Sequence, residues 1–203
     1  MECENIEHMN PKTLDSHTLI LAYTNGYFPM PNPENDEIMW FSPDPRAIIP
    51  LDGFHCSRSL KRRINKKNYT IRINQDFEGV MAGCASREET WINQEFKRAY
   101  MELHQLGLAH SLEITRDNRL IGGVYGVAIG GAFFAESKFH RETDASKIAL
   151  YHLVEHLNAK GFILLEVQFL IPHLKTLGAV EIPAMEYDHI LKQATAMKIR
   201  FPP

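Results

Sequence analysis

Residues 123–137 read GVYGVAIGGAFFAES and residues 161–168 read GFILLEVQ, with a polar loop and an amphipathic stretch between them. Short apolar runs broken by small residues are typical of two buried strands in a hairpin, which we expect across 123–137. Apolar residues recur with helical spacing over 145–160, so this stretch predicts a helix that ends at Gly161. The apolar run over 162–171 predicts a strand that is buried on both faces. This succession of elements predicts an α+β or α/β domain.

Two polar residues, Glu166 and Gln168, interrupt the second apolar run. Because side chains alternate along a strand, residues two apart lie on the same face. A carboxylate and an amide on an otherwise apolar strand are costly unless they have polar partners or a chemical role. The pair is therefore the first candidate for catalysis. The polar loop before the helix ends at Asp144, a residue type that favours the N-cap position, so Asp144 is the expected N-cap.

Composition and charge exclude several function classes. The chain has 203 residues, 44% of them hydrophobic, which suffices for one sizeable core or two unequal domains. The net charge of −3 excludes a global attraction to nucleic acid, so any such attraction must come from a local patch. Cys3, Cys56 and Cys84 have no paired spacing, which favours a reducing compartment over a disulfide framework. Residues 1–10 do not resemble a signal peptide, and no apolar run approaches the ~20 residues of a membrane span. We expect a cytoplasmic protein with no membrane partner.

The first part of the chain differs in character from the rest. A short helix is expected over 14–23, and turn-forming and proline-rich segments follow it. Within them, the aromatic pair Trp40 and Phe41 has two interpretations: part of a proline-stiffened loop that covers a core, or a platform on which a ring stacks. We place a boundary near residue 68, which predicts a small N-terminal domain (1–68) and a larger domain (69–203).

Residues 57–67 read SRSLKRRINKK, a basic run without an acidic residue. The run predicts a basic helix with Ser57 as its N-cap. Most charge runs are solvated faces, but segregated positive charge in a chain that is acidic elsewhere favours an anionic partner, and a phosphate backbone is the obvious candidate. The six cations are Arg58, Lys61, Arg62, Arg63, Lys66 and Lys67.

Three further motifs are weak indications of a functional site. His152 and His156 stand in an H-x-x-E-H pattern without a convincing third ligand, so no metal site is expected. The glycines within the expected strands lack the pattern of a phosphate-binding loop and favour close packing or a bulge. Ser137 lacks the G-x-S-x-G context of a hydrolytic nucleophile. Its neighbour Glu136 stands where a strand gives way to a loop, and is expected to accept a hydrogen bond from a polar ligand.

Nine short motifs, in order between about residue 18 and residue 184, together resemble the leucyl/phenylalanyl-tRNA–protein transferase family. Any one of them is weak, and nine in register are specific. The motifs are NGYFPM (25–30), WFSPDPR (40–46), FHCSRSLKR (54–62), TWI (90–92), HSLE (110–113), GGVYGV (122–127), ES (136–137), ASK (145–147) and LGA (177–179).

The resemblance implies an aminoacyltransferase that needs no cofactor. Such an enzyme moves an amino acid, Leu or Phe or else Met, from aminoacyl-tRNA to the N-terminal α-amine of a protein or peptide. The product is marked for degradation by the bacterial N-degron pathway. The resemblance also implies a GNAT-like (acyl-CoA N-acyltransferase-like) larger domain, in which an aminoacyl-adenosine end takes the place of acetyl-CoA.

The resemblance also implies roles for residues. The family's Asp-x-Gln pair falls on Glu166 and Gln168: Gln168 is expected to orient the attacking amine while Glu166 polarises it or takes its proton. Which group takes the proton stays open. The aromatic residues that stack on adenosine in the family correspond to Trp91 and to Trp40 or Phe41. The aminoacyl side chain is expected in an apolar pocket with Glu136, Ser137 and Lys138 beside it. The implied pocket residues are Val124, Phe133, Leu150, Leu153, Leu157 and Leu165.

Three positions depart from the family pattern. Glu166 is one methylene longer than the aspartate, Lys138 replaces a methionine at the edge of the apolar pocket, and Ile171 replaces an asparagine that could bond the substrate. These departures allow a shifted specificity for the donor or for the acceptor. Lys138 has two interpretations: its stem lies on the pocket wall with the ammonium in water, which is the one we favour, or the ammonium faces an acid, such as the first residue of a protein that begins with Asp or Glu.

Two other functions compete with this one. A CoA-dependent N-acyltransferase of the same fold would need a glycine-rich turn before the helix at Ala145, where the chain reads KFHRETD (138–144). A non-catalytic tRNA-binding module would account for the basic helix and leave Glu166 and Gln168 unexplained.

Overall fold

The computed structural model describes residues 14–32, 34–35, 37–86 and 90–202. The expectations for Cys3 and for residues 1–10 lie outside this part of the chain. The described elements are α1 (Ser16–Thr24), β1 (Phe28–Pro31), β2 (Ile38–Phe41), β3 (Arg46–Ile48), α2 (Arg58–Asn65), β4 (Thr70–Ile73), α3 (Phe77–Ala85), α4 (Gln94–Gln105), β5 (Ala109–Arg116), β6 (Arg119–Ile129), β7 (Ala132–His140), α5 (Ala145–Lys160), β8 (Leu164–Gln168), α6 (Pro172–Lys175), β9 (Val180–Ile182) and α7 (Ala184–Thr195).

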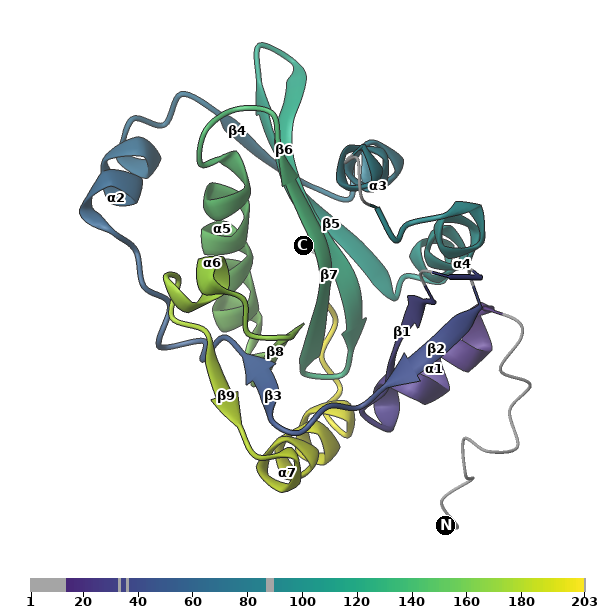
Figure 1. Ribbon diagram of the computed structural model, residues 1–203. Helices are drawn as coiled ribbons and strands as arrows, with labels where there is room; N and C mark the ends of the chain where they lie inside the picture. Colours follow the sequence, from purple (N-terminus) through teal and green to yellow (C-terminus); the bar gives the residue numbers. More distant parts are fainter. Residues whose placement is uncertain (1–13, 33, 36, 87–89, 203) are drawn as a thin grey trace.

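A mixed sheet forms the centre of the described fold, with the strand order β4-β5-β6-β7-β8-β3-β9 (Figure 1). Neighbouring strands from β4 to β7 are antiparallel, β7 and β8 are parallel, and β3 is antiparallel to β8 and to β9. Two parallel neighbours need a crossover connection, and α5 supplies it between β7 and β8. The hairpin, the helix and the strand expected within residues 123–168 are confirmed, and the architecture is α+β.

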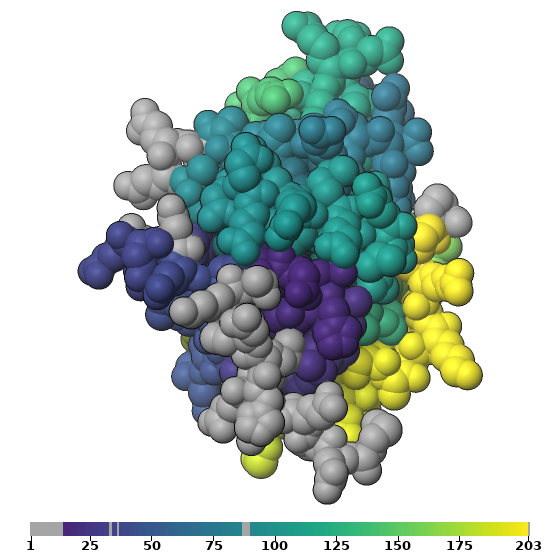
Figure 2. Space-filling model, turned by 90° about the vertical axis from the view of Figure 1, so that its right-hand side faces the viewer, coloured from purple at the N-terminus to yellow at the C-terminus, as the bar shows by residue number. Residues whose placement is uncertain are grey.

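Helices cover both faces of the sheet (Figure 1). α5 packs against β5, β6 and β7 on one face, and α3 and α4 pack on the other. Buried apolar side chains accordingly form two groups, one under α5 and one between the sheet, α1, α3 and α4. In Figure 2, the purple residues of α1 lie between teal residues that include α4 and the yellow residues near the C-terminus, and α1 contacts both α4 and α7.

The N-terminal part of the chain enters this sheet. β3 lies between β8 and β9, and Tyr23 and Phe28 belong to the same buried group as Phe96 and Phe134. β1 and β2 form a separate two-stranded sheet. The boundary near residue 68 stays a prediction, and the structure adds that the central sheet draws a strand from before it.

Among the described helices, side chains cap α1 and α2, the second as expected, and the cap expected for α5 is absent. Asp15 accepts a hydrogen bond from the backbone N of Thr18 (2.7 Å) at the start of α1, and Ser57 caps α2 through the backbone N of Leu60 (3.3 Å). The capping role expected of Asp144 is wrong. This residue occupies the N-cap position of α5 in the left-handed region, with φ +66°, and its side chain forms no capping bond to the described first turn. Its carboxylate instead pairs with Arg63 and Lys147.

The strand after Gly161 is shorter than expected. β8 ends at Gln168, whose φ of +65° turns the chain out of the sheet. The expectation that residues 162–171 form one fully buried strand is therefore wrong at its end, since Phe169 and Ile171 are 42% and 46% exposed. Within the described residues, no helix has both the length and the apolar character that crossing a membrane requires.

Candidate functional site

β7 and β8 pair only along part of their length. The parallel ladder joins Ala132–Phe134 to Leu164–Glu166, and beyond these residues the two strands no longer pair. A cavity of about 190 Å³ opens there, lined by the residues that follow the paired segment on both strands. The lining residues are Trp91, Val124, Ala135, Glu136, Ser137, Lys138, Leu150, Val167, Gln168, Phe169, Ile171 and Leu174.

The cavity has one apolar wall and one polar wall. Val124, Leu150, Val167 and Leu174 belong to the buried group under α5, so the apolar wall is continuous with the core. A wall that is part of a packed core keeps its shape when a ligand binds. Glu136 and the side chain of Gln168 form the polar wall.

A β-bulge places Glu136 in the cavity. Tyr125 pairs with Ser137 and Gly126 pairs with Ala135, so Glu136 is the extra residue of β7. A Cβ atom at Gly126 would collide with the carbonyl oxygen of Phe134, which explains the glycine opposite the bulge. The expectation that glycines in these strands mark a bulge or close packing is confirmed here.

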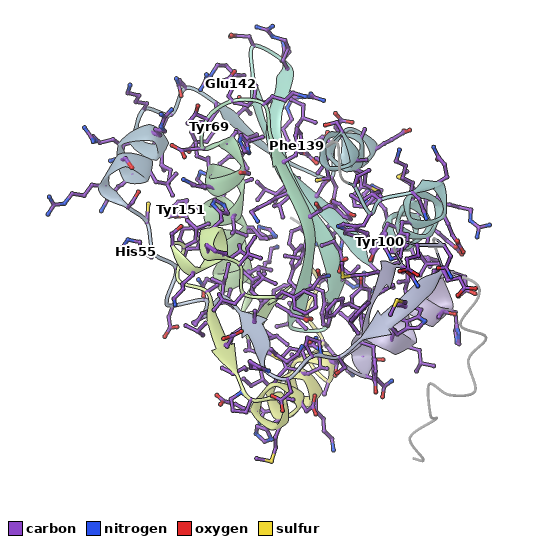
Figure 3. The ribbon with its side chains drawn as sticks, viewed as in Figure 1. His55, Tyr69, Tyr100, Phe139, Glu142 and Tyr151 are labelled. Carbon is purple, nitrogen blue, oxygen red and sulfur yellow. The ribbon has the colours of Figure 1, made fainter. Side chains whose placement is uncertain are left out.

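Three donors converge on the Glu136 carboxylate. Tyr23 of α1 donates its hydroxyl to Oε1 (2.7 Å), Tyr100 of α4 donates to Oε2 (3.0 Å), and Gln168 donates Nε2 to the same Oε2 (3.2 Å). The two tyrosine hydroxyls lie 2.6 Å apart. Figure 3 labels Tyr100, which lies on α4. The carboxylate of β7 is thus held by three other elements of the fold, α1, α4 and β8.

Burial sets the ionisation of this group. It raises the pKa of Glu136 to about 7, although the hydrogen bonds from Tyr23 and Tyr100 act in the opposite direction. Burial also raises the pKa of both tyrosines well above its usual value, so they stay protonated and act as donors. A carboxyl group with a pKa near 7 at a cavity can accept or release a proton at neutral pH.

Gln168 presents an acceptor to the same cavity. Because its nitrogen donates to Glu136, the amide oxygen remains to accept a hydrogen bond. Positive φ is uncommon outside glycine, and a non-glycine residue that adopts it often belongs to a functional site. Gln168 therefore supplies an oriented acceptor next to a carboxylate that titrates near neutrality.

Glu166 has a different environment. It is 1% exposed and forms a buried ion pair with Arg46, and Tyr187 donates its hydroxyl to the other carboxylate oxygen over 2.8 Å. Burial raises the pKa of Glu166, and Arg46 counteracts that shift. Glu166 does not belong to the described lining of the cavity. Its expected action on the reacting amine stays a prediction.

Arg46 connects this ion pair to the N-terminal part of the chain. Its guanidinium donates to the carbonyl oxygen of Gly26 (2.5 Å) and lies over the ring of Tyr187, 4.1 Å from the centroid. Arg46, Glu166 and Tyr187 thus link β3, β8 and α7 two residues before Gln168 on β8.

The structure brings seven of the expected catalytic and substrate-binding residues to the cavity and leaves seven elsewhere, which are Glu166 and the six described next. Phe133, Leu153, Leu157 and Leu165 are buried in the core group to which the apolar wall belongs, and Phe133 packs on Phe201, with 5.1 Å between centroids. Trp40 and Phe41 of β2 pack partly buried on the other core group. The seven at the cavity are Trp91, Val124, Glu136, Ser137, Lys138, Leu150 and Gln168.

Phe41 is separated from the cavity by two rings. It stacks on Phe28 with 6.1 Å between centroids, and Phe28 meets Phe169 edge-on at 5.5 Å. Trp91 lines the cavity directly and contacts Phe96 edge-on at 5.2 Å. Of the aromatic residues expected to stack on adenosine, Trp91 is therefore the one with access.

Sequence reasoning missed the partners of both carboxylates. Tyr23, Tyr100 and Tyr187 lie in helices whose periodicity indicates only burial, and nothing local marks their hydroxyls. Arg46 closes the WFSPDPR motif, which was a signal for it. Val167 and Phe169 were missed because residues 162–171 read as one buried strand, and Leu174 lies just beyond that run. Ile171 was noted only as a departure from the family pattern.

The six cations of the basic run divide into two sets. α2 is a helix as expected, and Arg62, Arg63 and Lys66 line an open groove of about 670 Å³. Arg58, Lys61 and Lys67 are exposed and do not belong to the described lining of that groove.

The two histidines of the H-x-x-E-H pattern have separate partners. His152 lies 2.9 Å from the hydroxyl of Tyr69 and 2.8 Å from Glu155, and His156 lies 2.6 Å from the carbonyl oxygen of Phe201. Among the described residues, no group of three or more His, Cys, Asp or Glu side chains is arranged to hold a metal ion.

Known sequences of one family match this chain along nearly its whole length. Residues 48–192 match the family model described as leucyl/phenylalanyl-tRNA protein transferase, and residues 12–44 match the model of its N-terminal domain. A leucyl/phenylalanyl-tRNA–protein transferase from Cereibacter sphaeroides (strain ATCC 17025) is 51% identical, over 96% of this chain and 92% of that protein. One from Ruegeria sp. (strain TM1040) is 54% identical, over 90% of this chain and 87% of that protein.

Comparison with solved structures finds more distant similarity. A GCN5-related N-acetyltransferase-like protein from Streptococcus suis aligns with 79% of this chain and 61% of its own, at 14% identity and a TM-score of 0.44. L-PGS from Bacillus licheniformis aligns with 75% of this chain and 50% of its own, at 13% identity and a TM-score of 0.44.

Proposed function

Because this chain belongs to the leucyl/phenylalanyl-tRNA–protein transferase family, we propose that it transfers an amino acid from aminoacyl-tRNA to the N-terminal α-amine of a protein. The observation that carries the proposal is the cavity between β7 and β8, where an apolar wall faces Glu136 and Gln168. An apolar wall suits a leucyl or phenylalanyl side chain, and the polar wall suits an amine.

The donor end of the tRNA occupies this cavity. The aminoacyl side chain packs on Val124, Leu150, Val167 and Leu174, and burial of its apolar surface favours binding by about 25 cal/mol per Å². Trp91 offers the ring on which the terminal adenine stacks, an interaction worth roughly 1–3 kcal/mol per base.

The reaction is the aminolysis of an ester. The acceptor's α-amine attacks the carbonyl carbon, a C–N bond forms, and the ester C–O bond breaks. The amine must lose a proton as the bond forms, and the departing ribose oxygen must gain one. The pKa of an α-amine in an unstructured peptide is ~7.7–8.0, so part of it is neutral at pH 7 and can attack directly.

Glu136 takes the proton in this mechanism, and the amide oxygen of Gln168 orients the amine. Glu136 lines the cavity, has a pKa of about 7, and is hydrogen-bonded to Gln168. The protonated carboxyl can then pass the proton to the leaving oxygen. The ester is already activated, so holding the amine and the carbonyl carbon in contact contributes a large part of the rate.

Glu166 positions Gln168 in this mechanism. Both of its oxygens are engaged, by Arg46 and by Tyr187, and it lies two residues before Gln168 on β8. The alternative, in which Glu166 itself acts on the amine, requires it to leave the ion pair. That would place an uncompensated guanidinium in the core.

A transfer assay tests the function. Radiolabelled leucyl-tRNA, phenylalanyl-tRNA and methionyl-tRNA are incubated with peptides that differ only in their first residue, and with the same peptides acetylated at the N-terminus. We expect label on the free peptides and none on the acetylated ones. Absence of transfer from all three donors, or label on the acetylated peptides, would overturn the proposal.

Two variants test the assigned residues. Glu136→Gln and Gln168→Ala should each lower the single-turnover rate by about 10²–10⁴-fold, the usual contribution of acid–base groups, with little change in tRNA affinity. Ser137→Ala is the comparison variant, since Ser137 lines the same cavity and the proposed mechanism gives it no part in the proton transfer. Near-normal rates in both variants would remove the pair from the mechanism.

A further inference from the structure

The groove beside α2 is lined by cations from three separate segments. α2 supplies Arg62, Arg63 and Lys66, the end of β5 supplies Arg116, and the loop between β7 and α5 supplies Arg141. Among the described residues that line the groove, the one acid is Glu142, which Figure 3 labels on that loop. Five cations against one acid make the lining positive in a chain whose net charge is −3, and two of the five are in ion pairs, Arg116 with Glu142 and Arg63 with Asp144.

Contacts with the body of the protein hold the two additional arginines in place. Arg116 donates Nε to the carbonyl oxygen of Asn68 (2.8 Å) and Nη2 to Oδ1 of the same residue (3.1 Å), and it forms an ion pair with Glu142. Arg141 donates Nη1 to the carbonyl oxygen of Leu120 (2.9 Å) and lies over the ring of Phe139. Arginines that are already ordered lose less side-chain entropy when an anion binds.

Two segments of the chain contribute lining residues to both the groove and the cavity. On the β7 side, Lys138 lines the cavity and Arg141, three residues later, lines the groove. On α5, Leu150 lines the cavity and Ile148 lines the groove. Three residues of extended chain span roughly 10 Å, so an RNA strand whose last nucleotide occupies the cavity reaches the groove within a few nucleotides.

We propose that this groove, through Arg116 and Arg141 together with α2, binds the phosphates of the donor RNA next to its aminoacylated 3′ end. The proposal rests on the proposed function, because it assumes that the 3′ end occupies the cavity. It extends the tRNA site from α2 to Arg116 and Arg141 on the other segments that line the groove. The phosphates close to the reacting ester would then lie in the groove.

A pair of charge-matched variants tests the assignment. Arg116→Gln/Arg141→Gln removes two positive charges from the groove, and Lys192→Gln/Lys198→Gln removes two from exposed positions in and after α7. Both change the net charge equally. Affinity is measured by filter binding over a range of salt concentrations, for aminoacyl-tRNA and for a minihelix made of the acceptor stem and the 3′ end.

The groove variant should weaken both RNAs by about three- to tenfold at ~0.1 M salt, and flatten the log–log salt slope by about 1.4 for two contacts to a single strand. The lysine variant should leave affinity and slope at wild-type values. An aminoacyl-adenosine donor has no phosphates to bind, so transfer from it should be equal in all three proteins.

A second pair of variants leaves Arg116 and its contacts with Asn68 and Glu142 intact. Thr143 is an exposed residue of the groove, so Thr143→Glu adds a negative charge there and Thr143→Gln adds the same bulk without charge. Only Thr143→Glu should weaken RNA binding.

Several results would overturn the proposal. The first is an unchanged salt slope in the groove variant. The second is an equal loss of RNA affinity in the lysine variant. The third is a loss of affinity for tRNA without a loss of affinity for the minihelix. A defect confined to acidic acceptor peptides would assign the groove to the protein substrate instead. Failure of the proposed function would look different, since wild-type protein would then transfer from neither donor while the binding slopes could still be compared.

Discussion

Gln168 donates a hydrogen bond from Nε2 to Oε2 of Glu136 over 3.2 Å, at the point where β7 and β8 have stopped pairing. A bulge on one strand and a positive φ on the other bring these two side chains together. Glu166, which precedes Gln168 on the same strand, is directed into an ion pair with Arg46. The strand β8 thus carries an amide that lines the cavity and a carboxylate that is engaged in a buried ion pair.

The rate of transfer should depend on pH through Glu136. Its pKa of about 7 means that the carboxylate needed to accept a proton becomes populated as the pH rises through 7. Single-turnover rates of the wild type should rise with an apparent pKa near 7, and in Glu136→Gln only the titration of the α-amine near ~7.7–8.0 should remain. Identical pH profiles for the two proteins would exclude Glu136 as the base.

Folding stability should also depend on pH through this residue. The pKa of Glu136 is raised from 4.5 to about 7 in the folded protein, so the folded state binds its proton more tightly than the unfolded state. Its contribution to stability is then fully present below pH 4.5 and is lost as the pH rises through 7. Urea unfolding of wild type and Glu136→Gln at about pH 5 and about pH 8, on either side of the raised pKa, measures this. The stability difference between the two proteins should change with pH, and a constant difference would contradict the shift.

The buried ion pair should show strong coupling between its members. Arg46→Met or Glu166→Gln alone leaves one charge buried without its partner and should cost about 3–5 kcal/mol of unfolding free energy. The double variant removes both charges, so its cost should be smaller than the sum of the two single costs. Denaturant unfolding of all four proteins gives the coupling free energy.

Turnover in the same four proteins separates positioning from catalysis by Glu166. If Glu166 positions Gln168, turnover should be lower in each single variant and partly restored in the double variant, with KM little changed. A double variant as stable as its better parent but as inactive as Glu166→Gln would place Glu166 in the chemical step.

Lys138 should influence which acceptor is used. It lies in the lining of the cavity, where an acidic first residue of the acceptor gains energy from the ammonium and an Arg or Lys first residue loses it. A competition between Asp-starting and Arg-starting peptides should favour the Asp peptide less in Lys138→Met than in wild type. If the ratio of the two rates is equal in both enzymes, the ammonium is directed to water and Lys138 has no part in acceptor choice.

The two sets of cations on α2 should differ in their effect on tRNA. Arg62→Gln/Arg63→Gln/Lys66→Gln removes the three that line the groove, and should weaken all tRNAs alike while flattening the salt slope by about 0.7–0.9 per lost contact. Arg58→Gln/Lys61→Gln/Lys67→Gln is the matched control from the other set. Equal salt slopes in the two triple variants would mean that the groove itself contributes nothing.

The sequence by itself determined the elements and the family. Apolar periodicity placed the hairpin of β6 and β7 and the helix α5 within the described chain, and the charge run placed α2. These features depend on neighbours within about ten residues, so local patterns are sufficient to identify them. The sequence also singled out Glu136, Gln168 and Trp91, which line the cavity, because an isolated polar side chain in an apolar run and a short motif are local signals.

Only the tertiary structure decided which polar groups meet. Tyr23 reaches Glu136 across 113 residues of chain and Arg46 reaches Glu166 across 120, and Arg116 and Arg141 come from segments far from α2. Sequence reasoning assigned the proton transfer to Glu166 or left it open, because two carboxylates in apolar strands look alike until their partners are known. The fold distinguishes them physically: one is neutralised by a buried arginine, and the other is held by neutral donors, so burial raises its pKa to about 7.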